Sequence, residues 1–240
     1  MLKAVLFDLD GTLLDIDIEA FLGTYFAALS GALAEVFDND EDLRQAMRAV
    51  SDATGSMMRP HEERTNRQVF YAEFESQTGV DLASHDDLLE RFYRDVFPTL
   101  NAGIAPASGG LESIAAAREC GLRIAVATNP IFPRAAILHR MAWAGVFPDQ
   151  VDVITDFDLM HATKPHPAYF RETAALLGVD PTDCLMVGDD RVLDLSAADV
   201  GMRTFHVSED SDAAANYAGT MNDVPAMIRR LCSGDASPLD

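Results

Sequence analysis

The sequence has few basic residues for its length. Lys and Arg together number 18 in 240 residues, against 39 Asp and Glu, and the formal net charge is −21. Proteins that bind nucleic acid or anionic lipid surfaces rely on Lys and Arg to neutralise phosphates. The sequence therefore predicts no nucleic-acid partner and no membrane partner.

Cysteines and long apolar runs are also scarce. The three cysteines, Cys120, Cys184 and Cys232, lie far apart and form no CxxC pair, which argues against a disulfide framework and a Cys-ligated zinc site. No stretch approaches the length of a transmembrane helix, and the apolar run that ends at Asp8 is too short for a signal peptide. We therefore expect a soluble, cytoplasmic protein.

Short apolar runs alternate with amphipathic stretches along most of the chain. The runs predict buried strands at residues 2–9, 123–127, 151–154, 184–187 and 204–207. Helical stretches, each followed by a glycine, are expected at residues 111–120, 135–143, 168–177 and 193–200. Alternating strands and helices indicate a parallel sheet in a doubly wound α/β domain.

The interval between the first two strands has a different pattern. Apolar residues from Ile18 to Val36 follow the spacing of an amphipathic helix, and further helices are expected at residues 41–51, 65–77 and 85–97. We therefore predict a core domain over residues 1–15 and 102–240, with an all-helical domain over residues 16–101 inserted after the first strand.

Polar residues that could form a site follow the apolar runs. In open α/β sheets ligands bind beyond the carboxyl ends of the strands, where we expect these residues to meet. Five of the nine are carboxylates, and such a cluster needs a divalent cation and an ammonium group to offset its charge. Oxygen ligands suit Mg²⁺. The nine residues are Asp8, Asp10, Thr12, Thr128, Asn129, Lys164, Asp189, Asp190 and Asp194.

Four segments in this order resemble the motifs of the haloacid dehalogenase superfamily. They are Asp8-Leu9-Asp10-Gly11-Thr12, Thr128-Asn129, Lys164-Pro165, and Gly188-Asp189-Asp190 with Asp194 four residues further on. The helical insertion after the first motif resembles the C1 cap of the same superfamily. The resemblance implies a Rossmann-like core, an aspartyl nucleophile and Mg²⁺. Because the first motif has two aspartates, it also implies phosphatase activity.

The resemblance implies a catalytic role for each motif, and the chemistry of the residues agrees. Asp8 would attack phosphorus to form a phosphoaspartyl intermediate. Asp10 would protonate the leaving group and then activate water. Thr128 and Asn129 would hold phosphoryl oxygens, with Thr12 fixing the loop. Lys164 would offset the negative charge of the carboxylates and the phosphoryl group.

The expected metal ligands come from the first and last motifs. They are the side chains of Asp8 and Asp189 and the backbone carbonyl of Asp10, whereas Asp190 and Asp194 would lie in or next to the shell of residues around these ligands.

The function expected from these residues is a Mg²⁺-dependent phosphomonoester hydrolase of a small phosphorylated metabolite, working as a monomer or homodimer. Two alternatives stay open, a phosphomutase of the same fold and a non-enzymatic protein that accepts or binds phosphate. Superfamily members that cleave carbon–halogen bonds resemble the sequence less, because they lack the second acidic residue that Asp10 supplies.

The predicted cap has one basic cluster, residues 59–67. Arg suits recognition of a second anionic group on a substrate. We favour a solvated face instead, in which Glu62 and Glu63 pair with the arginines.

Overall fold

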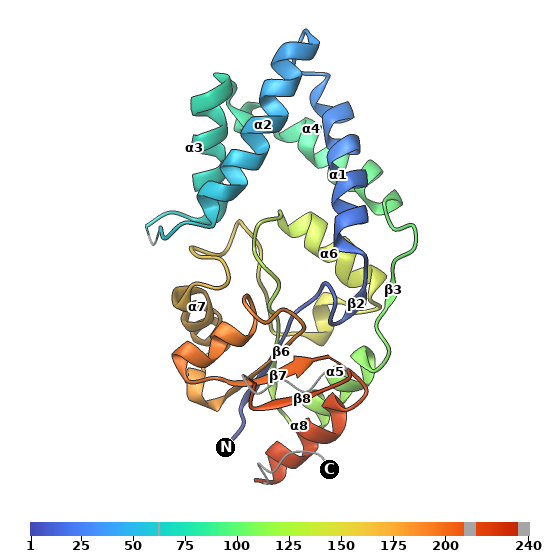
Figure 1. Ribbon diagram of the computed structural model, residues 1–240, viewed down its shortest axis with the longest axis vertical. Coiled ribbons are helices and arrows are strands. Elements are labelled where there is room, and N and C mark those ends of the chain that lie inside the picture. Colours follow the sequence, from blue (N-terminus) through green and yellow to red (C-terminus); the bar gives the residue numbers. More distant parts are fainter. Residues whose placement is uncertain (62, 209–214, 235–240) are drawn as a thin grey trace.

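A six-stranded sheet of parallel strands forms the centre of the core (Figure 1). The computed structural model describes residues 1–61, 63–208 and 215–234. The spatial order is β5-β4-β1-β6-β7-β8, and β1 therefore lies between β4 and β6. The strands are β1 (Ala4–Phe7), β4 (Arg123–Val126), β5 (Val153–Ile154), β6 (Cys184–Gly188), β7 (Arg203–Val207) and β8 (Tyr217–Gly219).

Helices cover both faces of this sheet, as the alternation of side chains along β1 requires. Val5 and Phe7 belong to an apolar cluster with residues of α5 (Gly110–Glu119), α6 (Arg134–Trp143) and α8 (Val224–Ser233). Ala4 and Leu6 point to the opposite face, where they pack with α7 (Pro167–Leu177) and the 3₁₀ helix η6 (Leu195–Val200). The predicted Rossmann-like, doubly wound α/β fold is thus confirmed.

The inserted segment is helical in the structure. Figure 1 shows its helices gathered at the end of the molecule away from the N-terminus and α8. The elements are α1 (Ile18–Leu33), α2 (Asp40–Met57), α3 (Asn66–Thr78), the 3₁₀ turn η1 (Leu82–His85), α4 (Asp86–Arg91), the π-helical turn η2 (Phe92–Val96) and the 3₁₀ turn η3 (Phe97–Thr99). None of the helices in the described part of the chain is long and apolar enough to cross a membrane.

Local signals in the sequence set where these helices begin. The side chain of Asp17 caps α1, and that of Asn39 accepts two backbone N–H groups at the start of α2. Thr65 and Gln68 form a reciprocal capping box at α3. Each cap satisfies donors that a helix leaves unpaired at its first turn.

The two linkers of the insertion pair with each other. β2 (Leu14–Asp15) and β3 (Ala105–Pro106) form an antiparallel ribbon, with Leu14 opposite Pro106. The chain therefore leaves the core and returns to it at one place. The bounds of the two domains, residues 15/16 and 101/102, stay a prediction.

Two expectations for the elements differ from the structure, and some short elements were not expected. Residues 85–97 are not one helix but α4, η2 and η3, because Pro98 cannot continue an α-helix and the chain widens before it, with Phe97 N–H bonding to Phe92 C=O. Residues 195–200 form a short 3₁₀ helix rather than an α-helix. The three-residue strand β8 is too short to be recognised as an apolar run, and two further 3₁₀ turns, Pro148–Gln150 and Pro181–Asp183, link core elements.

Leu6 and Leu176 offer a matched test of this packing. Leu6 is fully buried in the central strand, whereas Leu176 on α7 is 43% exposed. We expect Leu6→Ala to lower the free energy of unfolding by about 2–5 kcal/mol, because it leaves a cavity in the core. Urea denaturation followed by circular dichroism measures the change. A loss no larger than that of the control, Leu176→Ala, would contradict the assigned layering.

Candidate active site

The predicted site residues meet at the carboxyl edge of the central strands. Asp8 follows β1 directly, and Asp189 follows β6 directly. They open onto a cavity of about 290 Å³. Every predicted site residue except Thr12 lines it, namely Asp8, Asp10, Thr128, Asn129, Lys164, Asp189, Asp190 and Asp194. Thr12 is fully buried behind Asp189 and donates a 3.1 Å hydrogen bond to its Oδ1.

Lys164 lies between two buried carboxylates. Its Nζ donates to Asp8 Oδ1 at 2.7 Å and to Asp194 Oδ1 at 2.6 Å. The Lys164 side chain is 1% exposed, and its ammonium lies 5.9 Å from the centre of the Tyr169 ring. The Lys164 ammonium therefore joins two aspartates that lie 156 and 30 residues from it in the sequence.

These contacts change the proton affinity of each group. Burial raises the pKa of Asp8, Lys164 opposes that effect, and the nearby charge of Asp194 adds to it, so the pKa lies well above its usual value. Burial alone would lower the pKa of Lys164, but Asp194 and Asp8 outweigh it and raise the pKa above the usual value. Lys164 is therefore always charged at neutral pH.

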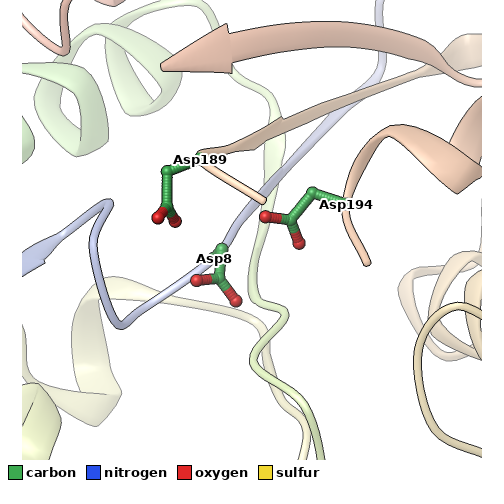
Figure 2. Close-up of side chains that lie close together, drawn as sticks. All are labelled: Asp8, Asp189 and Asp194. Atoms are coloured by element: carbon green, nitrogen blue, oxygen red, sulfur yellow. The ribbon is translucent and has the colours of Figure 1, made fainter. Parts of the chain in front are cut away.

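Three carboxylates form a candidate metal site. Asp8, Asp189 and Asp194 each place one oxygen within 4.8 Å of the others, and Figure 2 shows their side chains side by side. Such an oxygen-only set fits a hard divalent cation. Both oxygens of Asp194 already accept hydrogen bonds, one from Lys164 Nζ and the other from the Asp190 N–H at 3.0 Å. Asp189, by contrast, is exposed to solvent and accepts a hydrogen bond from the neutral hydroxyl of Thr12.

Two glycines make room for these carboxylates. Gly11 has a φ of +78°, and a Cβ on it would lie 2.6 Å from Cγ of Asp189. A Cβ on Gly188 would lie 2.7 Å from the Cβ of Asp194. Only glycine therefore fits at either position while the carboxylates keep their places.

Asp10 has a separate cationic partner, Arg140 of α6. Nη1 of Arg140 donates to Asp10 Oδ2 at 2.5 Å. The Arg140 side chain is 1% exposed and stacks on Phe132, with Cζ 4.5 Å from the ring centre. Asp10 Oδ1 and the Nε and Nη2 of Arg140 are buried without a hydrogen-bond partner among the described residues. One oxygen of Asp10 is thus anchored while the other is unengaged.

Sequence reasoning missed Arg140, although a signal existed. Ala136, Ile137 and Met141 define the buried face of α6, and Arg140 falls on the same face. A charged residue in an apolar stripe is almost never fully buried unless it is paired.

The remaining predicted residues serve to connect the loops. Asn129 Oδ1 accepts from the Lys164 N–H at 3.2 Å, and the Thr128 carbonyl accepts from the hydroxyls of Thr155 and Tyr169. Asp190 Oδ1 accepts from the N–H groups of Val192 and Leu193. Asp190 therefore stabilises the turn after β6, and its carboxylate is directed into that turn.

This arrangement agrees with comparisons to known proteins. The haloacid dehalogenase-like hydrolase family matches residues 2–200, and the chain belongs to this family. The predicted family is thus confirmed, and the protein is a hydrolase.

Relatives and solved structures agree with that assignment. The phosphoglycolate phosphatase of Xylella fastidiosa (strain Temecula1) is 31% identical over 198 residues, which cover 82% of this chain and 75% of the relative. An HAD phosphatase from Thermococcus onnurineus superposes with a TM-score of 0.58 at 23% identity, covering 98% of this chain and 100% of that one. A 2-haloacid dehalogenase from Pseudomonas syringae pv. Tomato gives 0.62 at 21% identity, covering 96% and 100%. The two structures show the fold alone.

Lys164→Met removes the cation between Asp8 and Asp194. We expect the free energy of unfolding at pH 7, measured by urea denaturation in EDTA, to fall by about 3–5 kcal/mol, because two buried carboxylates lose their partner. The deficit will shrink as the pH falls, since the neutral acid needs no cation and the pKa of Asp8 is raised.

Lys3→Met is the control for this variant, because Lys3 pairs with Asp183 at the exposed surface. Equal losses for the two variants would show that the buried ion pairs of Lys164 add nothing to stability.

Proposed function

We propose that this hydrolase is a Mg²⁺-dependent phosphatase that acts on a small phosphorylated metabolite through a phosphoaspartyl intermediate on Asp8. The observation that carries the proposal is the position of Asp8, whose carboxylate lies at the end of the central strand in a cavity shared with Lys164 and Asp10. The similarity to phosphoglycolate phosphatase at 31% identity supports the same class of reaction.

In the first step, an oxygen of Asp8 attacks phosphorus and the ester P–O bond breaks. Asp10 gives its proton to the leaving oxygen through Oδ1, the atom that Arg140 leaves unengaged. The products of this step are the free alcohol and phospho-Asp8. Lys164 stays charged beside the attacking carboxylate and offsets the negative charge of the phosphoryl group.

In the second step, Asp10 takes a proton from a water molecule that attacks phosphorus. The P–O bond to Asp8 breaks, which frees inorganic phosphate and restores the carboxylate. Asp10 is ionised at this stage because it has given its proton to the leaving group in the first step. The Thr128 hydroxyl and the Asn129 N–H are the proposed donors to the phosphoryl oxygens, because both residues line the same cavity.

Asp8, Asp189 and the backbone carbonyl of Asp10 are the proposed ligands of Mg²⁺, and Asp194 supports them through Lys164. The bound cation would neutralise charge on the phosphoryl oxygens. Residues 16–101 are proposed to act as a cap over this cavity, since Leu22 of α1 lines it.

Asp8→Asn is the test of the nucleophile. An amide cannot form the phosphoenzyme, so we expect hydrolysis of an aryl phosphate to fall at least about a thousandfold with the fold unchanged. Phosphate release and circular dichroism measure the two properties. Asp199→Asn, at an exposed position outside the cavity, is the matched control. Near-normal turnover in Asp8→Asn would overturn the mechanism.

Asp10→Asn separates the two chemical steps. Without a base to activate water, phospho-Asp8 should accumulate after treatment with an aryl phosphate, whose leaving group needs little protonation. Mass spectrometry of the intact protein detects the added phosphoryl group. If product instead carries a transferred phosphoryl group and no phosphate is released by the wild type, the protein is a mutase.

Mg²⁺ should stabilise the folded protein by binding it in preference to the unfolded chain. We expect the Tm to rise with Mg²⁺ concentration in the wild type, and to rise much less in Asp189→Asn. Differential scanning fluorimetry with and without EDTA measures this, with Asp199→Asn as control. An unchanged Mg²⁺ response in Asp189→Asn would remove Asp189 from the proposed ligands.

A further inference from the structure

A second and larger cavity lies between the helical insertion and the core. Its volume is about 650 Å³, against about 290 Å³ for the catalytic cavity. Pockets that hold small organic ligands usually have volumes of this order. Residues of α1, α2, α3 and α4 line it, together with the core segments 131–135 and 157–158.

The large cavity borders the catalytic one. Leu22 of α1 and the core residues Ile131 and Phe132 line both. A substrate whose phosphoryl group lies next to Asp8 would therefore extend its leaving group past these three side chains into the larger space.

The walls of the large cavity are mainly apolar. Aromatic side chains supply much of the surface, and Phe26 is 37% exposed. Among the aromatic residues that line it are Tyr25, Phe26, Phe70, Tyr71, Tyr93 and Phe157. Surfaces of this kind bind apolar and aromatic groups.

The arginines at this cavity already have carboxylate partners. Arg67, from the basic cluster of the sequence, pairs with Asp86 at 3.1 Å and with Asp158 at 3.2 Å. Arg67 therefore pairs with carboxylates of α4 and of the core segment 157–158. Of the two predicted partners, Glu62 lies outside the described residues.

The other two lining arginines are paired as well. Arg94 contacts Asp95 at 2.9 Å, and Arg134 contacts the buried Asp156 at 2.9 Å. Each lining arginine of the described residues therefore already has a carboxylate partner. A carboxylate of the substrate would also meet Asp86, Glu90 and Asp158, which line the same cavity.

From this geometry we infer that the substrate is a phosphomonoester whose leaving group carries a neutral apolar or aromatic body, bound in the 650 Å³ cavity. The inference rests on the proposed phosphatase function and narrows its substrate class. It sets this chain apart from an enzyme that selects a small anionic substrate such as phosphoglycolate.

Matched substrates test the inference. Ethyl phosphate and 2-phenylethyl phosphate both release a primary alcohol, so their reactivity is similar and only the apolar body differs. We expect kcat/KM for 2-phenylethyl phosphate to exceed that for ethyl phosphate, and that for phosphoglycolate, at least about tenfold, because a phenyl ring is removed from water. Equal values, or a preference for phosphoglycolate, would overturn the inference.

A pair of variants on α6 ties the preference to this cavity. Ala135 lines the cavity and Ala142, two turns further along, does not; both are exposed. Ala135→Phe fills the cavity from its rim, so the ratio of kcat/KM for 2-phenylethyl phosphate to that for ethyl phosphate should fall about tenfold. Ala142→Phe should keep the wild-type ratio. A ratio that stays the same in Ala135→Phe would contradict the assigned cavity.

Binding to the Asp8→Asn variant separates this inference from the proposed function. Calorimetry in the presence of Mg²⁺ should give a dissociation constant for 2-phenylethyl phosphate at least about tenfold below that for ethyl phosphate. Tighter binding without turnover by the wild type would sink the phosphatase proposal and keep the apolar site. Hydrolysis of all three esters by the wild type, together with equal dissociation constants, would keep the phosphatase proposal and overturn the apolar site.

Discussion

The contact on which this site depends is the ammonium of Lys164 held between Asp8 and Asp194. Neither carboxylate can lie buried at the end of the sheet without a cation, and the same ammonium joins the loop before α7 to those after β1 and β6. Lys164 has only one charge, however, and Asp189 forms no ion pair in the described part of the chain. The site therefore has an excess of negative charge, which a divalent cation would offset.

Asp8 and Asp10 are two residues apart but occupy different surroundings. Asp8 faces a lysine that a second carboxylate shares, whereas Asp10 faces Arg140, which stacks on the ring of Phe132. Two carboxylates with different partners can take different protonation roles at one pH. The turn directly after Asp10 depends on Gly11, whose missing Cβ also leaves space for Asp189.

The sequence predicted those features of the fold and the site that depend on residues close together in the chain. Each strand run and the polar residue after it lie within one short segment, so Asp8 and Asp189 could be assigned to one edge of the sheet. Lys164 does not follow a strand directly and was assigned there from the motif Lys164-Pro165. Arg140 and the large cavity were missed because they depend on how α6 packs against α1 and η3, contacts far apart in the chain. The π-helical turn before Pro98 was not predicted because the spacing of apolar residues does not encode it.

The β2–β3 ribbon has a consequence for how such a protein can evolve. Because Leu14 and Pro106 are paired, the two ends of the insertion lie next to each other. The distance between these two ends in the core is therefore the same whatever the inserted segment contains. A segment with adjacent ends is joined to its host with little loss of chain entropy. Recombination could thus exchange the whole helical segment, and with it the shape of the larger cavity, while every strand and every charge around Asp8 stays in place.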